Sequence, residues 1–310
     1  MSPVGILPVN KPCGVRSTDC VEKIKRILGR KTKAGHGGTL DSTASGLLIL
    51  LLGPATRLSN FIMALPKCYE TEIQLGRTTS TDDASGEILF ERSFEGITNE
   101  SIDLALPSFR GWRMQKPPMI SAVHVDGKRA HELTRSGQTP EIDAKPVYFM
   151  RTERISEISG DGRVRFRLLC SKGTYVRSFA RDIGEKLGCG AHVSALVRSS
   201  VGPFTLEAAP RYDDLLAMTR DELMEQIVRF DALLATANAY AIQGAQADSL
   251  RNGQSQNLKQ LRRLTLGNAL SDKFLIAGDG IFSICAASAE GDSLTLRPST
   301  NIFYGGTAEE

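Results

Sequence analysis

Hydrophobic residues recur at helical spacing near the start of the chain. Val21, Ile24, Ile27 and Leu28 share one face of a predicted amphipathic helix over residues 17–30. Asp19 followed by Glu22 resembles a capping box at its start. The apolar run "LLILLLG" then favours a helix or helix pair over about residues 44–65, broken near Gly53-Pro54.

Later segments alternate between apolar and polar positions, which predicts strands at 69–75, 88–93, 147–158 and 163–170. Helices are expected from Thr98 to about Leu106 and over 173–188, the second ending at Gly188 and Gly190. Residues 111–145 read as irregular around one short basic helix near 129–136, and residues 78–87 as a loop.

After Tyr240 the helical pattern fades, and strand-like runs follow at 274–280, 282–288 and 292–298. Strands and helices intermix without a regular βαβ rhythm. We therefore predict an α+β fold, with a mixed, largely antiparallel sheet flanked by helices and a small β-rich C-terminal domain.

Composition places the chain among ordinary globular proteins, with 41% hydrophobic and 24% charged residues in 310. No apolar run approaches the roughly 18 residues of a membrane span, and the first residues lack signal-peptide features. The cysteines form no C-x-x-C pair, which favours reduced thiols in a cytoplasmic protein over disulfides or a metal site. They are Cys13, Cys20, Cys68, Cys170, Cys189 and Cys285.

Positive charge is concentrated in two segments, although the net charge is only +3. Residues 21–33 hold six Lys or Arg against one Glu, a local balance of +5. Residues 251–263 hold four basic residues and no acidic one, a balance of +4. Either segment alone is typical of a solvated face, but the two together favour a polyanionic partner.

The loop "GHGGTLDSTASG", residues 35–46, carries the most distinctive chemistry. Asp41 is a good N-cap residue for a helix from about Ala44, and on spacing alone this structural role is favoured. The loop is neither a P-loop nor a G-x-G-x-x-G nucleotide motif. The alternative is that Asp41 takes part in catalysis.

Four segments together resemble the TruB family of tRNA pseudouridine synthases, in the same order and spacing over about residues 4–205. They are "NKPCGVRS" (10–17), "GHGGTLDSTASG" (35–46), "KCYETEIQLGRTTSTDDASG" (67–86) and "CSKGTYVRSFARDIGEKLGCGAHVSALVRSSVG" (170–202). The resemblance implies conversion of uridine-55 in the tRNA T loop to pseudouridine. It implies no cofactor and no metal, the T stem-loop of tRNA as the partner, no membrane, no required protein partner, and a cytoplasmic monomer.

The resemblance also implies roles for particular residues. Asp41 would be the nucleophile, Arg177 its ion-pair partner and Tyr69 the ring that stacks on the target base. Tyr175 and Leu196 would wall the pocket, His36 would pack against the flipped nucleotide, and Lys11 with Pro12 would support the loop. Gly35, Gly37 and Gly38 would let the loop backbone approach RNA. Arg198 would bind phosphate or cap a helix end.

These roles have structural alternatives, because Tyr69 and Tyr175 are equally compatible with core packing and Arg177 with a surface position. A carboxylate can trap the carbocation-like state of a breaking glycosidic bond, and a nearby arginine would keep it ionised. The residues do not decide whether Asp41 attacks the ribose or the pyrimidine ring.

The domain division expected from the resemblance is a catalytic domain at 1–240, with an RNA-clasping insertion at about 113–145, and a small PUA-like domain at 241–310. Four positions depart from the family pattern. Ile120 and His131 stand where tyrosines are common, His124 where lysine is common, and Ser42 where proline follows the nucleophile.

Two other functions fit parts of the sequence. A guide-RNA-dependent pseudouridine synthase would carry a full PUA domain and usually lack the insertion. A non-catalytic tRNA-folding chaperone would not need Asp41, Tyr69 and Arg177 together. The insertion and these three residues favour the standalone enzyme.

Overall fold

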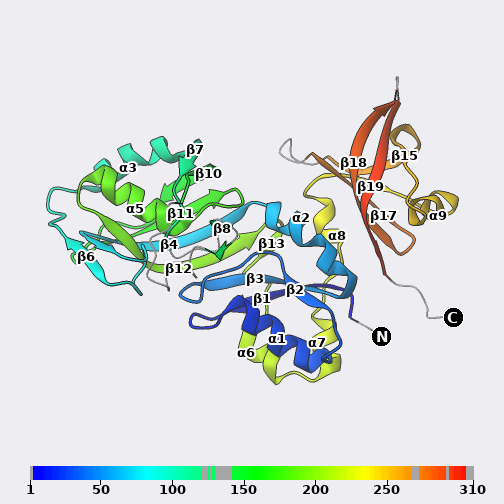
Figure 1. The fold of residues 1–310 in the computed structure, drawn as a ribbon, viewed down its shortest axis with the longest axis horizontal. Helices are drawn as coiled ribbons and strands as arrows, with labels where there is room; N and C mark the ends of the chain where they lie inside the picture. The colour runs from blue at the N-terminus through cyan, green and yellow to red at the C-terminus, as the bar shows by residue number, and fades with distance from the viewer. Residues whose placement is uncertain are drawn as a thin grey trace.

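The computed structural model describes residues 3–119, 124–125, 128–129, 142–266, 272–290 and 293–304. Within them the chain builds two main sheets, which lie beside one another along the long axis of the molecule (Figure 1). The predicted α+β class, with a largely antiparallel sheet, flanking helices and a β-rich C-terminal region, is confirmed.

The first sheet has the order β1-β3-β12-β4-β11-β10-β7, with β2 pairing β3 and β13 pairing β12. Its neighbours on this path are antiparallel except β3 and β12, which are parallel. The strands are β1 (Gly5–Lys11), β2 (Ala34–His36), β3 (Ser45–Leu52), β4 (Lys67–Leu75), β7 (Gly111–Gln115), β10 (Lys145–Arg154), β11 (Arg163–Cys170), β12 (Ala191–Val201) and β13 (Phe204–Thr205).

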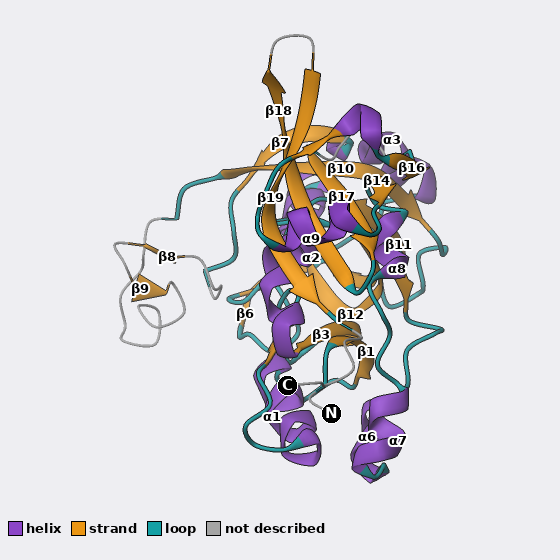
Figure 2. Ribbon diagram, turned by 90° about the vertical axis from the view of Figure 1, so that its right-hand side faces the viewer, coloured by secondary structure: helices purple, strands orange, loops and turns teal. Residues whose placement is uncertain are grey.

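The second sheet has the order β15-β19-β18-β17-β14-β16 and forms the right-hand part of Figure 1. Its strands are β14 (Asn238–Ala241), β15 (Gln256–Asn257), β16 (Arg262–Thr265), β17 (Lys273–Gly278), β18 (Ile281–Glu290) and β19 (Ser293–Phe303). Two small hairpins complete the strands, β5 (Arg77–Thr79) with β6 (Ile88–Glu91) and β8 (His124–Val125) with β9 (Lys128–Arg129). Figure 2 shows β8 and β9 to one side of the main body.

Helices cover the first sheet at both ends. The α-helices are α1 (Ser17–Leu28), α2 (Ser59–Ala64), α3 (Asn99–Ala105), α5 (Val176–Leu187), α6 (Tyr212–Ala217), α7 (Arg220–Glu225), α8 (Asp231–Leu234) and α9 (Ala245–Arg251). The described residues also contain three 3₁₀ helices, η1 (Gly53–Leu58), η2 (Leu106–Phe109) and η3 (Leu258–Gln260). None of the helices in the described residues is long and apolar enough to cross a membrane.

The predicted helix over 44–65 is wrong for its first half, because residues 45–52 form β3. One face of β3 packs with α1, α6 and α7 through Leu48 and Leu50, and the other packs with η1, α2 and the second sheet through Leu47 and Ile49. A strand buried on both faces has a continuous apolar sequence, which periodicity cannot distinguish from a buried helix. The predicted break at Gly53-Pro54 is where η1 begins.

Three smaller expectations also differ from the structure. The Asp19–Glu22 capping box is wrong, because Arg16 is the N-cap of α1 and Asp19 pairs with the Arg16 side chain at 3.0 Å. Part of the region expected to be irregular is strand β7, at the edge of the sheet. The region after Tyr240 contains helix α9.

The other elements agree with the pattern. Thr98 caps α3 in a capping box with Ser101, and Gly188 ends α5 in the left-handed conformation. Residue 129 lies in β9, whereas the rest of the basic helix expected at 129–136 lies outside the described residues. The α5 side of the first sheet has its own core, in which Phe179 contacts the rings of Phe109, Phe149 and Phe166.

Candidate active site

Asp41 lies in the loop that leads from β2 into β3, and a strand rather than a helix follows it. The helix-cap role is therefore wrong, although a turn does form because the Ala44 N–H donates to the Asp41 carbonyl at 3.1 Å. Gly37 opens the loop where a Cβ would lie 2.2 Å from the Ile62 Cγ2 atom. A larger residue there would displace the loop from α2.

The Asp41 carboxylate meets the Arg177 guanidinium, with 2.8 Å between Oδ2 and Nη2. Arg177 is the second residue of α5, and its side chain is 7% exposed, whereas that of Asp41 is 43% exposed. A charge-assisted hydrogen bond of this length fixes the direction of the carboxylate. One partner is thus fixed in the protein while the other stays accessible to a ligand.

Arg177 is itself held by the loop after β5. Its Nη1 donates to the Thr81 carbonyl at 3.3 Å, and its Nε lies 3.9 Å from the Asp83 carboxylate. Asp83 accepts hydrogen bonds from the Thr81 hydroxyl (2.7 Å) and from the Ser85 N–H (3.0 Å) and hydroxyl. Burial acts to raise the pKa of Asp83, but these hydrogen bonds and Arg177 outweigh it, so that its pKa is lowered.

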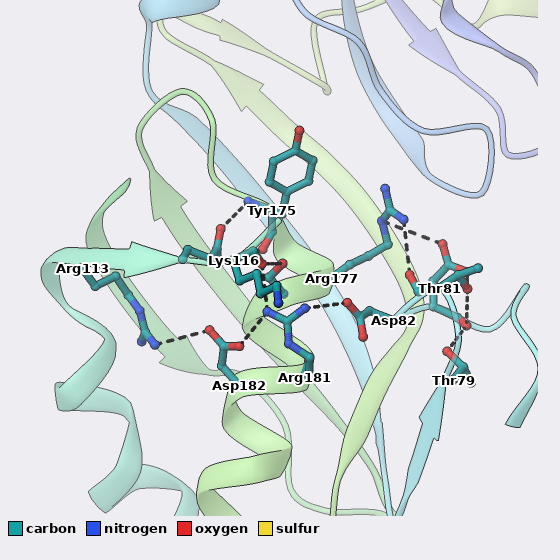
Figure 3. A network of polar contacts seen from close by, with 12 residues as sticks. Thr79, Thr81, Asp82, Arg113, Lys116, Tyr175, Arg177, Arg181 and Asp182 are labelled. Carbon is teal, nitrogen blue, oxygen red and sulfur yellow. Dashed lines mark hydrogen bonds and ion pairs between the residues drawn. The ribbon is translucent and has the colours of Figure 1, made fainter. Parts of the chain in front are cut away.

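A second polar network continues from this loop to α5 and β7 (Figure 3). Arg181 pairs with Asp82 at 2.9 Å and with Asp182 at 3.0 Å, and it donates to the Lys116 carbonyl at 2.9 Å. Asp82 has a φ of 58°, a left-handed conformation that is costly for a residue other than glycine. Arg181 therefore stabilises a strained turn directly beside Thr81 and Asp83.

Asp83 and Arg181 were not identified as site residues from the sequence. The available signal was the density of short polar residues in "TTSTDDASG", which predicts a turn but not which carboxylate faces Arg177. The pairing of Asp83 with Arg177 joins residues 94 positions apart (177 − 83), so no local spacing could reveal it.

Tyr69 lies on β4, opposite Leu168 of β11 and Arg198 of β12. It is partly buried and packs with Leu196 against the core that contains Phe166 and Phe179. Burial raises the pKa of the Tyr69 phenol, although the nearby Arg198 charge acts to lower it. Tyr69 and Leu196 thus pack against the same hydrophobic core.

Tyr175 precedes α5 and serves as its N-cap residue, rather than lying within the helix. Gln115 fixes its backbone, because the amide accepts from the Tyr175 N–H at 2.8 Å and donates to the Tyr175 carbonyl at 3.1 Å. In Figure 3 the Tyr175 ring and the Arg177 side chain project from the start of α5 toward the same side.

Two buried cations hold the Asp41 loop from opposite directions. The Lys11 ammonium donates to the carbonyls of Pro12, Val15 and Ala44 at 2.9, 2.8 and 2.6 Å. The Arg198 guanidinium donates to three carbonyls, those of Leu47, Thr39 and Gly38, at 2.7, 3.2 and 3.1 Å. Arg198 lies in strand β12, so its alternative role at a helix end is wrong. Both side chains therefore hold backbone carbonyls in and next to the loop.

His36 ends β2, directly before the loop. Its Nδ1 atom is buried and has no hydrogen-bond partner in the described part of the chain. Burial lowers the pKa of the ring, and the Arg198 charge lowers it further. The imidazole is therefore neutral near pH 7, which suits packing against a base.

Of the four positions that differ from the family pattern, the structure describes the side chain of Ser42 alone. Ser42 is exposed in the loop, where its carbonyl accepts from the Gly14 N–H at 2.7 Å. Ile120, His131 and the side chain of His124 lie outside the described residues, as does most of the expected clasp. No group of three or more His, Cys, Asp or Glu side chains with metal-site geometry occurs among the described residues.

Comparisons with known proteins show the family of this chain. Residues 25–176 match the TruB family pseudouridylate synthase N-terminal domain, and residues 177–237 match the tRNA pseudouridylate synthase B C-terminal domain. The chain is 43% identical over 257 residues to tRNA pseudouridine synthase B of Burkholderia mallei, covering 83% of this chain and 84% of that protein. It is 38% identical over 292 residues to tRNA pseudouridine synthase B of Pelotomaculum thermopropionicum, covering 92% of each.

A solved structure shares the fold at lower identity. The crystal structure of a Cbf5-Nop10-Gar1 complex superposes with a TM-score of 0.73 and 23% identity, covering 96% of this chain and 84% of that one. At this identity the likeness shows the fold alone, whereas the family matches and the relatives in sequence cover most of the chain. The chain belongs to the TruB family of pseudouridylate synthases.

Proposed function

We propose that the protein converts uridine-55 in the T loop of tRNA to pseudouridine, with Asp41 as the attacking carboxylate. Membership of the family makes the chain a tRNA pseudouridine synthase, an isomerase. The observation that supports the residue assignment most directly is the 2.8 Å contact between the half-exposed Asp41 and the buried Arg177.

The reaction is redox-neutral. The bond between ribose C1′ and uracil N1 breaks, a bond between C1′ and C5 forms, the hydrogen on C5 leaves as a proton, and N1 gains one. An ionised carboxylate serves either route to this product, because it can trap the carbocation-like ribose or add to the electron-poor ring. Arg177 holds the Asp41 carboxylate in a fixed direction in both cases. No step needs a cofactor.

The target base must leave the stacked loop before Asp41 can reach it, which costs a few kcal/mol. Stacking on an aromatic ring returns about 1–3 kcal/mol per base, and we assign this role to Tyr69 of β4. Tyr175 and Leu196 would form the pocket walls, and the neutral His36 would pack against the extruded nucleotide. Phosphate contacts would supply the remaining binding free energy.

Lys11 and Arg198 act in this proposal through the loop backbone, because both are buried on carbonyl groups that flank Asp41. Gly38 has a φ of 128°, a conformation that favours glycine, and its carbonyl accepts from Arg198. In this proposal its backbone approaches the RNA. We further propose a monomer that works without a protein partner, divided into a catalytic domain at 1–240 and a small domain at 241–310.

The guide-RNA-dependent alternative finds less support. The relatives named tRNA pseudouridine synthase B share 38–43% identity over most of the chain. The Cbf5 likeness rests on 23% identity and concerns the fold.

The direct test is to map pseudouridine in an unmodified tRNA transcript incubated with and without the protein. We expect one new pseudouridine, at position 55, without added cofactor or guide RNA. A transcript with cytidine at position 55 is the matched control and should gain none. Modification at another position, or a requirement for guide RNA, would overturn the site assignment.

A further inference from the structure

A cleft of about 740 Å³ lies between the connection from α1 to β2 and the last strand of the second sheet. Five basic side chains line it, and among the described lining residues there is no Asp or Glu. The basic residues are Arg30, Lys31, Lys33, Arg57 and Arg220. Three of them belong to the basic segment 21–33, but the other two come from η1 and α7, which no sequence pattern connected to it.

Hydrogen bonds to backbone carbonyls hold two of these cations in place. Arg57 of η1 donates from Nη1 to the Asn301 carbonyl of β19 at 3.1 Å. Arg220 donates from Nε to the Leu28 carbonyl, at the end of α1, at 3.4 Å. Arg220 also lies 3.6 Å from the carboxylate of Asp221, which is 94% exposed, so that this ion pair is weak.

Like charges gathered around a cleft repel one another and raise the local positive potential, which favours a polyanionic ligand. The wall formed by β19 adds Phe303, an aromatic side chain that is 49% exposed. Cationic side chains combined with an accessible aromatic ring are typical of grooves that follow a nucleic-acid backbone while a base or ribose packs on the ring.

The cleft is well separated from the catalytic aspartate. Strand β3 runs from the Asp41 loop at Ser45 to the cleft at Leu52 and Gly53. Its eight residues span about 23 Å at roughly 3.3 Å per residue. If the target nucleotide of an RNA lies at Asp41, the nucleotides that reach the cleft are therefore several stacked positions away from the target.

We propose that this cleft binds the sugar–phosphate backbone of tRNA outside the T stem-loop, and so forms a second contact with the substrate. The proposal rests on the proposed function, since it takes the T loop to be bound at Asp41. It gives the second sheet a role, because Phe303 and the carbonyl that holds Arg57 both come from β19.

The test is a triple variant, Arg30→Gln/Lys31→Gln/Lys33→Gln, assayed on full-length tRNA and on an isolated T stem-loop RNA. These side chains lie at the surface, so the fold should persist. We expect KM for full-length tRNA to rise about tenfold and KM for the stem-loop to stay unchanged. The slope of log Kd for full-length tRNA against log salt should fall by about 3, because each of the three replaced cations would otherwise neutralise one phosphate.

A matched control removes three other exposed arginines, Arg163→Gln/Arg165→Gln/Arg167→Gln. They lie on β11 and point to the opposite face from Leu168, the partner of Tyr69. This control has the same change in net charge and should bind both RNAs as the wild type does. Loss of tRNA affinity in both triple variants would show a general charge effect and overturn the proposal.

Two further results would also overturn it, namely wild-type behaviour of the cleft variant on both RNAs, or an equal loss on both. Binding is measured separately from turnover, so the cleft can be tested even if the function is wrongly assigned. If the wild type binds tRNA but modifies neither RNA, the proposed function fails. The difference in Kd for tRNA between wild type and variant would still show whether the cleft binds tRNA.

Discussion

Replacement of Arg177 by methionine tests how the site is built. Methionine keeps much of the aliphatic volume of a side chain that is 7% exposed, but it removes the guanidinium that contacts Asp41, Asp83 and the Thr81 carbonyl. Asp41 then loses its 2.8 Å partner while remaining half-exposed. We expect the fold to persist and the rate of the chemical step to fall.

The structure sets the magnitude. A hydrogen bond to a charged partner contributes about 1.5–3 kcal/mol, and the exposure of Asp41 places this one at about 1.5–2.5 kcal/mol. That corresponds to a decrease in kcat of about 10- to 70-fold, with little change in KM. Asp83 keeps its hydrogen bonds from Thr81 and Ser85, so the free energy of unfolding should fall by only about 1–2 kcal/mol.

The assay is single-turnover release of tritium from position 5 of uridine in tRNA, because pseudouridine formation replaces that hydrogen with a carbon–carbon bond. Arg167→Met is the matched control. Arg167 also pairs with a carboxylate at 2.8 Å, that of Glu70, but on the exposed face of β11, and its loss should leave the rate unchanged. A rate for Arg177→Met within twofold of the wild type would refute the assigned pairing.

Three other changes test the supports of the loop. Lys11→Met should leave three carbonyls without their donor and cost about 3 kcal/mol, seen as a fall in Tm of about 6–12 °C, and an unchanged Tm would contradict this. Gly46→Ala should lose both stability and activity, measured by thermal melts and turnover assays, because its Cβ would lie 2.4 Å from the Arg198 carbonyl oxygen and its φ is 108°. The control Gly173→Ala should keep activity, because the space around Gly173 is open, although its φ is 80°. Asp83→Asn should lower Tm most above about pH 4, because the pKa of Asp83 is lower in the folded protein than in the unfolded chain. The stability that the ionised carboxylate gives is then lost as the pH falls through the folded-state pKa. A difference in Tm between wild type and variant that does not change with pH, down to acid unfolding, would exclude this linkage.

Elements whose sequence pattern depends on residues close together in the chain were predicted correctly. The start of α3 was predicted at Thr98, which the structure shows to be its N-cap residue. The strand at 163–170 alternates because only one of its faces meets a core. These features depend on neighbouring residues in the chain.

Elements decided by distant partners were not predictable in this way. The run "LLILLL" becomes β3 because β1 and β12 pair with it and both faces are covered. Asp41 and Arg177 are 136 positions apart (177 − 41), so their contact could be expected only from the family resemblance. The roles of Asp83 and Arg181 depend on the left-handed turn at Asp82, for which the sequence gives no glycine signal.

The most direct test of the central claim compares Asp41→Asn with the wild type in pseudouridine formation at position 55, with tRNA binding measured in parallel. Asparagine preserves the shape of the side chain but cannot supply an ionised carboxylate. We expect no detectable pseudouridine and a Kd for tRNA within a few-fold of the wild type. Substantial turnover by Asp41→Asn would contradict the account.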